Sequence, residues 1–233
     1  MKSFTWIRHS AFAGICTLHA ALFAASAVGG QISATSGPTF SGPGLGLVNV
    51  AAIITTATNN DDEPGTDAAN NVVSPLKRFD STGYIDMVFT VTPTQGVTEY
   101  LFSEFVDNNS GVNWSSYTMQ LGFGTGAGFN QIGGAGDGLD FDTGPPGGNS
   151  LPPTSAVFPT VTRPNEDTLV FSGGIHGTDA QLYQFRVDVS DLAPTGGPTT
   201  FTIRQQPTAI PEPSAIVFAG LALIGLAVKR RYR

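Results

Sequence analysis

The sequence has few charged residues, a single cysteine and little that favours helices. Only 12% of its 233 residues are charged, about half the share usual in soluble globular domains. Lys and Arg number eleven against eighteen Asp and Glu, and this shortage of basic residues excludes nucleic acid as an expected partner. The 29 glycines and 16 prolines argue against a helical bundle, because both residues disfavour helix interiors. Hydrophobic residues still make up 40% of the chain, enough to form a core and to argue against wholesale disorder.

The N-terminal segment has the pattern of a secretory signal. A positively charged start is followed by an apolar stretch and then by the small residues Ala25 and Ala27, separated by one serine. This pattern predicts a signal peptide over residues 1–27, with the Sec translocon and signal peptidase as partners. The alternative is a segment that stays as an N-terminal anchor. Cleavage after Ala27 would remove Cys16, so the mature chain would contain neither disulfides nor thiolate chemistry.

The C-terminal segment combines three elements in a fixed order. A Pro-Glu-Pro tripeptide precedes the uncharged run 214–228, and a basic cluster ends the chain. The run predicts a transmembrane helix, and the positive-inside rule places the basic cluster in the cytoplasm. Fifteen helical residues rise only about 22 Å, which is short for a hydrocarbon core of about 30 Å. The residues of the tripeptide and the basic cluster are Pro211, Glu212 and Pro213, then Lys229, Arg230, Arg231 and Arg233.

This order resembles the PEP-CTERM sorting signal of Gram-negative, biofilm-forming bacteria, over residues 209–233. The same tail is also labelled the ice-binding protein C-terminal domain, a likeness that implies shared sorting and not ice binding. The resemblance implies that a membrane-embedded exosortase recognises Pro211, Glu212 and Pro213 and removes the tail. The helix would then lie in the inner membrane transiently, with the basic cluster as its stop-transfer signal. A retained tail anchor is the alternative.

The region between the two ends, residues 28–208, is expected to form one exported, acidic ectodomain. Between residues 28 and 210 the chain has five basic and seventeen acidic residues, a formal charge of −12. Segments of alternating apolar and polar residues, separated by Gly, Pro and Asn, predict an all-β antiparallel sandwich, with a jelly roll or barrel as alternatives. The expected strands are 45–58, 84–92, 99–106, 114–123, 168–171, 182–189 and a pair of alternating residues at 201 and 203.

Two stretches are expected to be long loops. Residues 58–74 are polar and acidic, and residues 122–153 are rich in Gly and Pro. Loops of this length are usually either functional or disordered. Asp137, Asp140 and Asp142 lie close together in the second loop and are candidate oxygen ligands for Ca²⁺. Their spacing fits no established calcium motif, so a solvated loop without a cofactor is the favoured interpretation.

No pattern in the sequence points to catalysis. His176 stands in a Gly-rich turn-like segment and is expected to be an exposed turn residue, since one histidine does not make a zinc site and no nucleophile elbow is present. Paired carboxylates for a glycosidase are not identifiable from sequence. Tyr100, Trp114 and Tyr117 would offer aromatic faces to a sugar, but their place in strand patterns favours core packing.

Together these features predict a non-enzymatic protein that is exported and placed on the cell surface or in the extracellular matrix. Its ectodomain would be structural or adhesive, with exopolysaccharide as a candidate partner. The alternative is a secreted carbohydrate-binding or polysaccharide-active protein.

Overall fold

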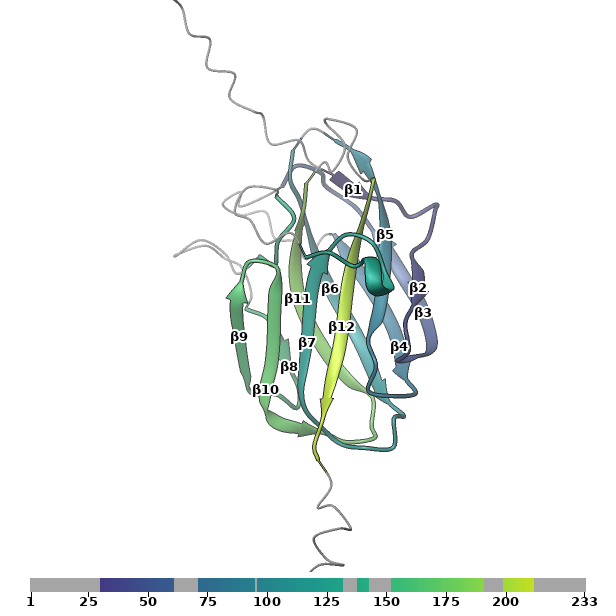
Figure 1. Cartoon of the computed structure of the whole chain (residues 1–233). Coiled ribbons are helices and arrows are strands. Elements are labelled where there is room, and N and C mark those ends of the chain that lie inside the picture. The colour runs from purple at the N-terminus through teal and green to yellow at the C-terminus, as the bar shows by residue number, and fades with distance from the viewer. Residues whose placement is uncertain are drawn as a thin grey trace, which may run out of the picture.

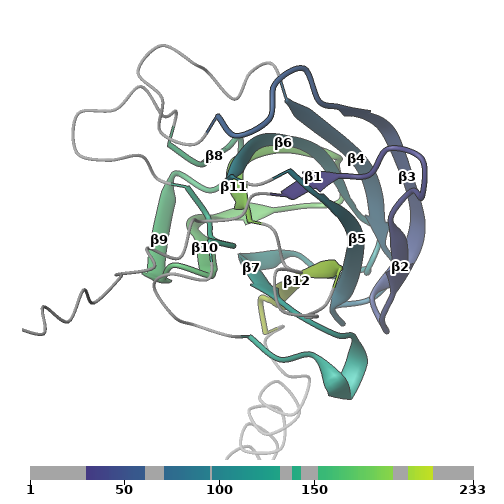
Figure 2. The ribbon, with the colours of Figure 1, turned by 90° about the horizontal axis from the view of Figure 1, so that it is seen from above.

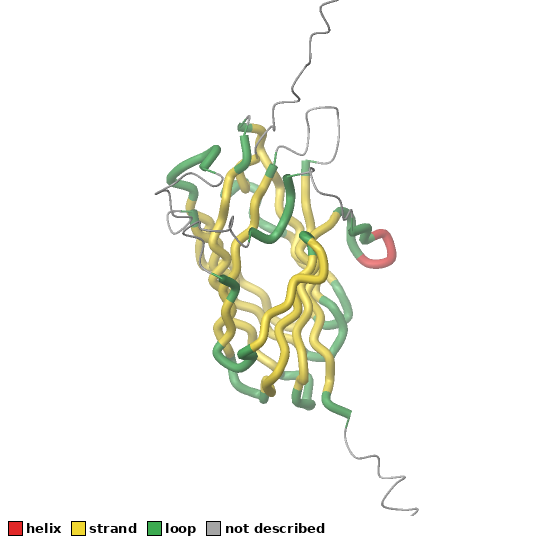
Figure 3. The backbone as a smooth tube through the Cα atoms, turned by 90° about the vertical axis from the view of Figure 1, so that its left-hand side faces the viewer, coloured by secondary structure: helices red, strands yellow, loops and turns green. Residues whose placement is uncertain are grey.

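The fold is all-β, as predicted, and consists of two sheets that face each other across a shared core (Figures 1 and 2). The computed structural model describes residues 30–60, 71–94, 96–131, 138–142, 152–190 and 199–211. The strands are β1 (Gly30–Ile32), β2 (Thr39–Ser41), β3 (Leu45–Ile54), β4 (Val72–Phe79), β5 (Ile85–Pro93), β6 (Thr98–Asn108), β7 (Trp114–Gly122), β8 (Thr154–Ser155), β9 (Thr160–Asn165), β10 (Thr168–His176), β11 (Gln181–Val189) and β12 (Thr200–Ala209). A short 3-10 turn, η2 (Gly126–Gly128), lies outside the strand layers (Figure 3).

The larger sheet has seven strands in the order β1-β5-β12-β7-β10-β9, with β2 paired to β5. The smaller sheet has five strands in the order β3-β4-β6-β11-β8. All pairs are antiparallel except β4 with β6, which run parallel, so the prediction of purely antiparallel sheets is wrong at this pair. Alternate residues of both sheets point inward, because one face of each sheet is buried and side chains alternate along a strand.

The predicted strands with clean alternation are confirmed, and their ends shift by a few residues. On β5 and β7 the inward positions hold Met87, Phe89 and Met119, each fully buried. Strand β10 is longer than expected, since it runs on to His176 through two glycines. At Gly173 the backbone has φ +82, and the register with β7 shifts there, which marks a bulge rather than the end of the strand.

Strand β4 was not predicted, and its first residues fall within the expected loop 58–74. Its inward positions include Pro75 and Lys77, which interrupt the apolar pattern. Proline lacks the N–H that an interior strand would donate. The register of β3 against β4 shifts beside Pro75, between Val50 and Ala52, and this irregularity accommodates the proline inside the sheet.

The expected loop 122–153 is partly built into the core. Leu139 and Phe141 are both buried, and Phe141 packs edge-on against Phe185 of β11 with ring centroids 5.7 Å apart. The backbone of Asp140 pairs with that of Asp188, also on β11. Residues 139–141 are therefore part of the core and not of the solvated loop that the composition predicts, whereas residues 124–128 are mostly exposed.

Candidate functional site

The C-terminal junction is the point where the folded part of the chain meets the Pro-Glu-Pro tripeptide. Strand β12 lies in the interior of the seven-stranded sheet, between β5 and β7. The backbone N–H of Ile210 then donates to the carbonyl of Asn113 at 2.8 Å, and Pro211 is exposed. The tripeptide therefore begins two residues after the last core strand, at its C-terminal end (Figure 1).

Most of the predicted targeting residues lie outside the described part of the structure. This holds for the signal peptide, for the transmembrane helix 214–228 and for the residues Ala25, Ala27, Glu212, Pro213, Lys229, Arg230, Arg231 and Arg233. Within the described ranges, no helix is long and apolar enough to cross a membrane.

The core contains a network of four polar side chains that the sequence did not reveal. Lys77 of β4 forms an ion pair with Glu104 of β6, and both side chains are fully buried. Gln205 of β12, in the opposite sheet, donates from Nε2 to Glu104 Oε2 at 3.0 Å. The hydroxyl of Tyr117 on β7 donates to Gln205 Oε1 at 2.6 Å. We call these four residues the core polar network; it joins the two sheets through their interior.

Burial shifts the pKa values of two members of this network, Lys77 and Tyr117. Removal from water disfavours charged forms, so burial lowers the pKa of Lys77, and the nearby Glu104 only partly opposes that effect. Burial likewise raises the pKa of Tyr117 well above its ordinary value. The second carboxylate oxygen of Glu104, Oε1, is buried and makes no hydrogen bond to any described residue. A buried polar atom without a hydrogen bond lowers the stability of the fold. Packing alone therefore does not explain why Glu104 lies here.

His176 is buried, and the prediction of an exposed turn histidine is wrong. Its Nε2 lies 2.9 Å from the carbonyl oxygen of Asp179 and its Nδ1 lies 2.9 Å from the hydroxyl of Tyr183. A carbonyl only accepts, so Nε2 carries the proton and Nδ1 accepts from the tyrosine. The ring also packs edge-on against Trp114, with centroids 4.6 Å apart. Both ring nitrogens are occupied, so this histidine is a core residue.

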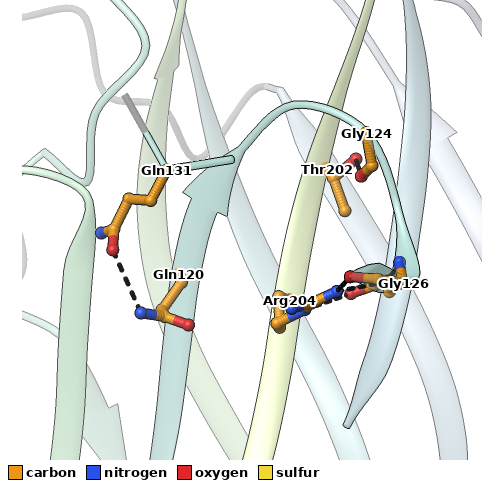
Figure 4. Close-up of polar contacts among 7 residues, drawn as sticks. Gln120, Gly124, Gly126, Gln131, Thr202 and Arg204 are labelled. Atoms are coloured by element: carbon orange, nitrogen blue, oxygen red, sulfur yellow. Dashed lines mark hydrogen bonds and ion pairs between the residues drawn. The ribbon is translucent and has the colours of Figure 1, made fainter. Parts of the chain in front are cut away.

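The Gly-rich segment 124–131 is fastened to the outer face of the seven-stranded sheet (Figure 4). Arg204 of β12 and Asp86 of β5 are directly opposed and form a bidentate pair, at 2.7 and 2.9 Å. Gly126 bonds to both: its N–H donates to Asp86 at 2.8 Å, and its carbonyl accepts from Arg204 at 2.8 Å. The guanidinium also lies between the rings of Tyr84 and Phe129, 4.0 and 4.1 Å from their centroids.

The candidate calcium ligands are only partly placed by the structure. Asp137 lies outside the described residues. Asp140 pairs with Arg163 at 3.4 Å, and Asp142 is mostly buried. Among the residues that the structure describes, no three His, Cys, Asp or Glu side chains are grouped as a metal site would need. The calcium site stays a prediction.

The three aromatic residues considered for sugar binding are core residues, as their strand pattern favoured. Tyr100, Trp114 and Tyr117 are all fully buried. They therefore present no faces to a polysaccharide in this fold.

Comparison with known proteins adds one match. The model of the PEP-CTERM protein-sorting motif matches residues 209–231. No curated protein and no solved structure matches the chain. The matched segment starts at Ala209, the last residue of β12, so the motif follows the folded part of the chain without a linker. The chain therefore carries a PEP-CTERM protein-sorting motif at the end of its final core strand.

Proposed function

We propose that this protein is a non-enzymatic β-sandwich ectodomain that is exported, released from its C-terminal tail by an exosortase and placed on the cell surface or in the extracellular matrix. The PEP-CTERM match at residues 209–231 supports export and exosortase sorting. A structural or adhesive role for the ectodomain is supported by the pairing of its described basic residues with carboxylates.

The observation that carries the proposal is the position of the motif relative to β12. An interior strand cannot leave its sheet without breaking the ladders to both neighbours. The tripeptide thus begins two residues after a strand that is fixed inside the sheet, and its first residue, Pro211, is exposed and available for recognition. Folding and sorting therefore depend on different parts of the chain. The sheets fix the point at which the tail begins, and the tail carries the sorting motif.

The basic residues of the described ectodomain support a structural role. Each of them pairs with a carboxylate: Lys77 with Glu104, Arg78 with Asp80, Arg163 with Asp140, Arg186 with Glu99 and Arg204 with Asp86. Enzymes that act on polar substrates usually keep perturbed titratable groups open to a cleft. Here burial lowers the pKa of Lys77 and raises the pKa values of Tyr117 and Tyr183, and all three side chains face the core.

Deletion of residues 210–233 tests the proposal in the native host. The truncated protein is expected to be exported and folded, but absent from the surface fraction. A Thr208→Ala variant, changed at an exposed position just before the junction, is the matched control and should be delivered normally. Surface delivery of the truncated protein at the wild-type level would disprove the sorting role of the tail.

A further inference from the structure

The core polar network brings together an amine, a carboxamide and a carboxylate in a dry environment. Lys77 and Gln205 both contact the same oxygen of Glu104, Oε2, and all three side chains have 0–1% of their surface exposed. The amine comes from the five-stranded sheet and the carboxamide from the seven-stranded sheet. Two groups that bond to one shared oxygen are kept near each other by the fold, so the entropy of bringing them together has already been lost on folding.

The carboxamide is polarised in the direction that favours attack on its carbon. The Tyr117 hydroxyl donates to Gln205 Oε1 at 2.6 Å, and the raised pKa of this buried tyrosine keeps the proton on the hydroxyl. A donor aimed at a carbonyl oxygen stabilises the negative charge that develops there when a nucleophile adds.

The amine is placed where its neutral form is favoured. Burial lowers the pKa of Lys77, and a neutral amine is the nucleophilic form. In a dry core, transfer of the lysine proton to Glu104 replaces two buried charges with a neutral amine and a neutral acid. Glu104 then has a proton to give to the nitrogen that leaves the carboxamide, and its Oε2 already contacts that nitrogen.

We propose that Lys77 and Gln205 form an intramolecular isopeptide bond, with Glu104 as the proton shuttle and Tyr117 as the donor to the carbonyl oxygen. Lys77 Nζ attacks Cδ of Gln205, and a bond forms between them. The bond from Cδ to Nε2 then breaks, and Nε2 leaves with the proton that Glu104 has taken from the lysine. The attacking nitrogen gives up its second surplus proton to the Glu104 carboxylate, which passes it to the released ammonia, so that the leaving group departs as ammonium and Glu104 is again a carboxylate. One amine and one primary amide give one secondary amide and one ammonia, Glu104 is regenerated, and no oxidant or co-reactant is needed.

Such a bond would link β4 of one sheet to β12 of the other through the middle of the core. It would lie on the strand that leads directly into the sorting motif. The only cysteine is Cys16, so the described domain has no disulfide to serve as a covalent link. A cross-link between distant segments restricts the unfolded chain and stabilises the fold, as a disulfide does in other exported proteins.

Mass spectrometry of the full-length protein after expression, denaturation and proteolysis tests this inference. The expected result is a pair of peptides, one containing Lys77 and the other Gln205, joined with loss of one ammonia. Free Lys77 and Gln205 peptides as the sole products would overturn it. A Lys77–Glu104 link with loss of one water would also overturn it, since Glu104 would then be consumed as the electrophile.

Variants separate the roles within the network. Lys77→Arg, Gln205→Asn and Glu104→Gln are expected to abolish the link, and Glu104→Gln does so while it keeps the amine and the carboxamide. Gln206→Asn changes the exposed neighbour on the same strand and should keep the link in full. An intact link in Glu104→Gln would disprove the shuttle. The digest of the wild-type protein decides by itself whether the bond exists, even if a variant fails to fold.

Discussion

His176 is a buried residue that the sequence predicted to be exposed. A single histidine beside glycines is typical of a turn, but here both ring nitrogens bond inside the core. Burial lowers the pKa of His176 below its usual value of 6.5. At mildly acidic pH, His176 therefore binds a proton in the unfolded chain but stays neutral in the folded chain.

This difference predicts a pH dependence of stability. Above pH 6.5 the histidine is neutral in both states and has no effect; below it, the unfolded state gains a proton and stability falls until the pH reaches the lowered folded pKa. Thermal unfolding of the wild type at pH 7.5 and 5.5 should show this loss, and His176→Gln should flatten the difference. An equal loss of stability in the wild type and in His176→Gln would show that His176 does not cause the pH dependence.

The Arg204–Asp86 pair gives a second prediction at the residue scale. Asp86 is buried, whereas the carboxylate of Asp80 in the Arg78 pair is 43% exposed. Removal of one partner from a buried pair leaves an uncompensated charge, so Asp86→Ala should lower the free energy of unfolding by about 2–4 kcal/mol. Asp80→Ala, the exposed control, should lower the free energy of unfolding much less, because solvent screens the exposed pair. Urea titration measures both, and equal losses would contradict the role of the buried pair.

Strand β10 passes close to the backbone of Val157 at Gly174. A Cβ added at Gly174 would lie 1.9 Å from the carbonyl oxygen of Val157, so backbone must move to admit it. Gly174→Ala should therefore lower the free energy of unfolding by about 1–3 kcal/mol. Gly128→Ala is the matched control, because a Cβ there meets no atom within 4 Å. If both variants unfold at the same urea concentration, the packing described for β10 is wrong.

Alternation identified the elements that bury only apolar side chains inward, such as β5 and β11. It missed the short strands β1, β2, β8 and β9. It also missed the longer strand β4, because the inward positions of β4 hold Pro75 and Lys77 as well as apolar residues. Strand β4 carries Lys77, one half of the buried ion pair, so the residue that interrupts the apolar pattern concealed both the strand and the core polar network. A pattern of hydrophobicity does not distinguish a polar residue paired inside a core from one facing water, since that depends on partners distant in the chain.

At the scale of the whole molecule, the sorting tail and the folded domain were predictable to different degrees. The tail is a linear signal, so the order of its residues was enough to identify it, and the family match bears this out. The domain depends on long-range contacts, such as that between Gln205 and Glu104, which no local pattern reveals. We propose that tail and domain act in sequence: an exosortase removes the tail that begins at the end of β12, and the folded domain is then delivered to the surface.

The most direct test is the C-terminal sequence of the mature protein recovered from the surface or the medium, determined by mass spectrometry. Exosortase processing predicts a mature chain that keeps β12 and lacks the apolar run 214–228 and the basic cluster. A mature chain that ends in Arg233 would contradict the account and show a retained membrane anchor in its place.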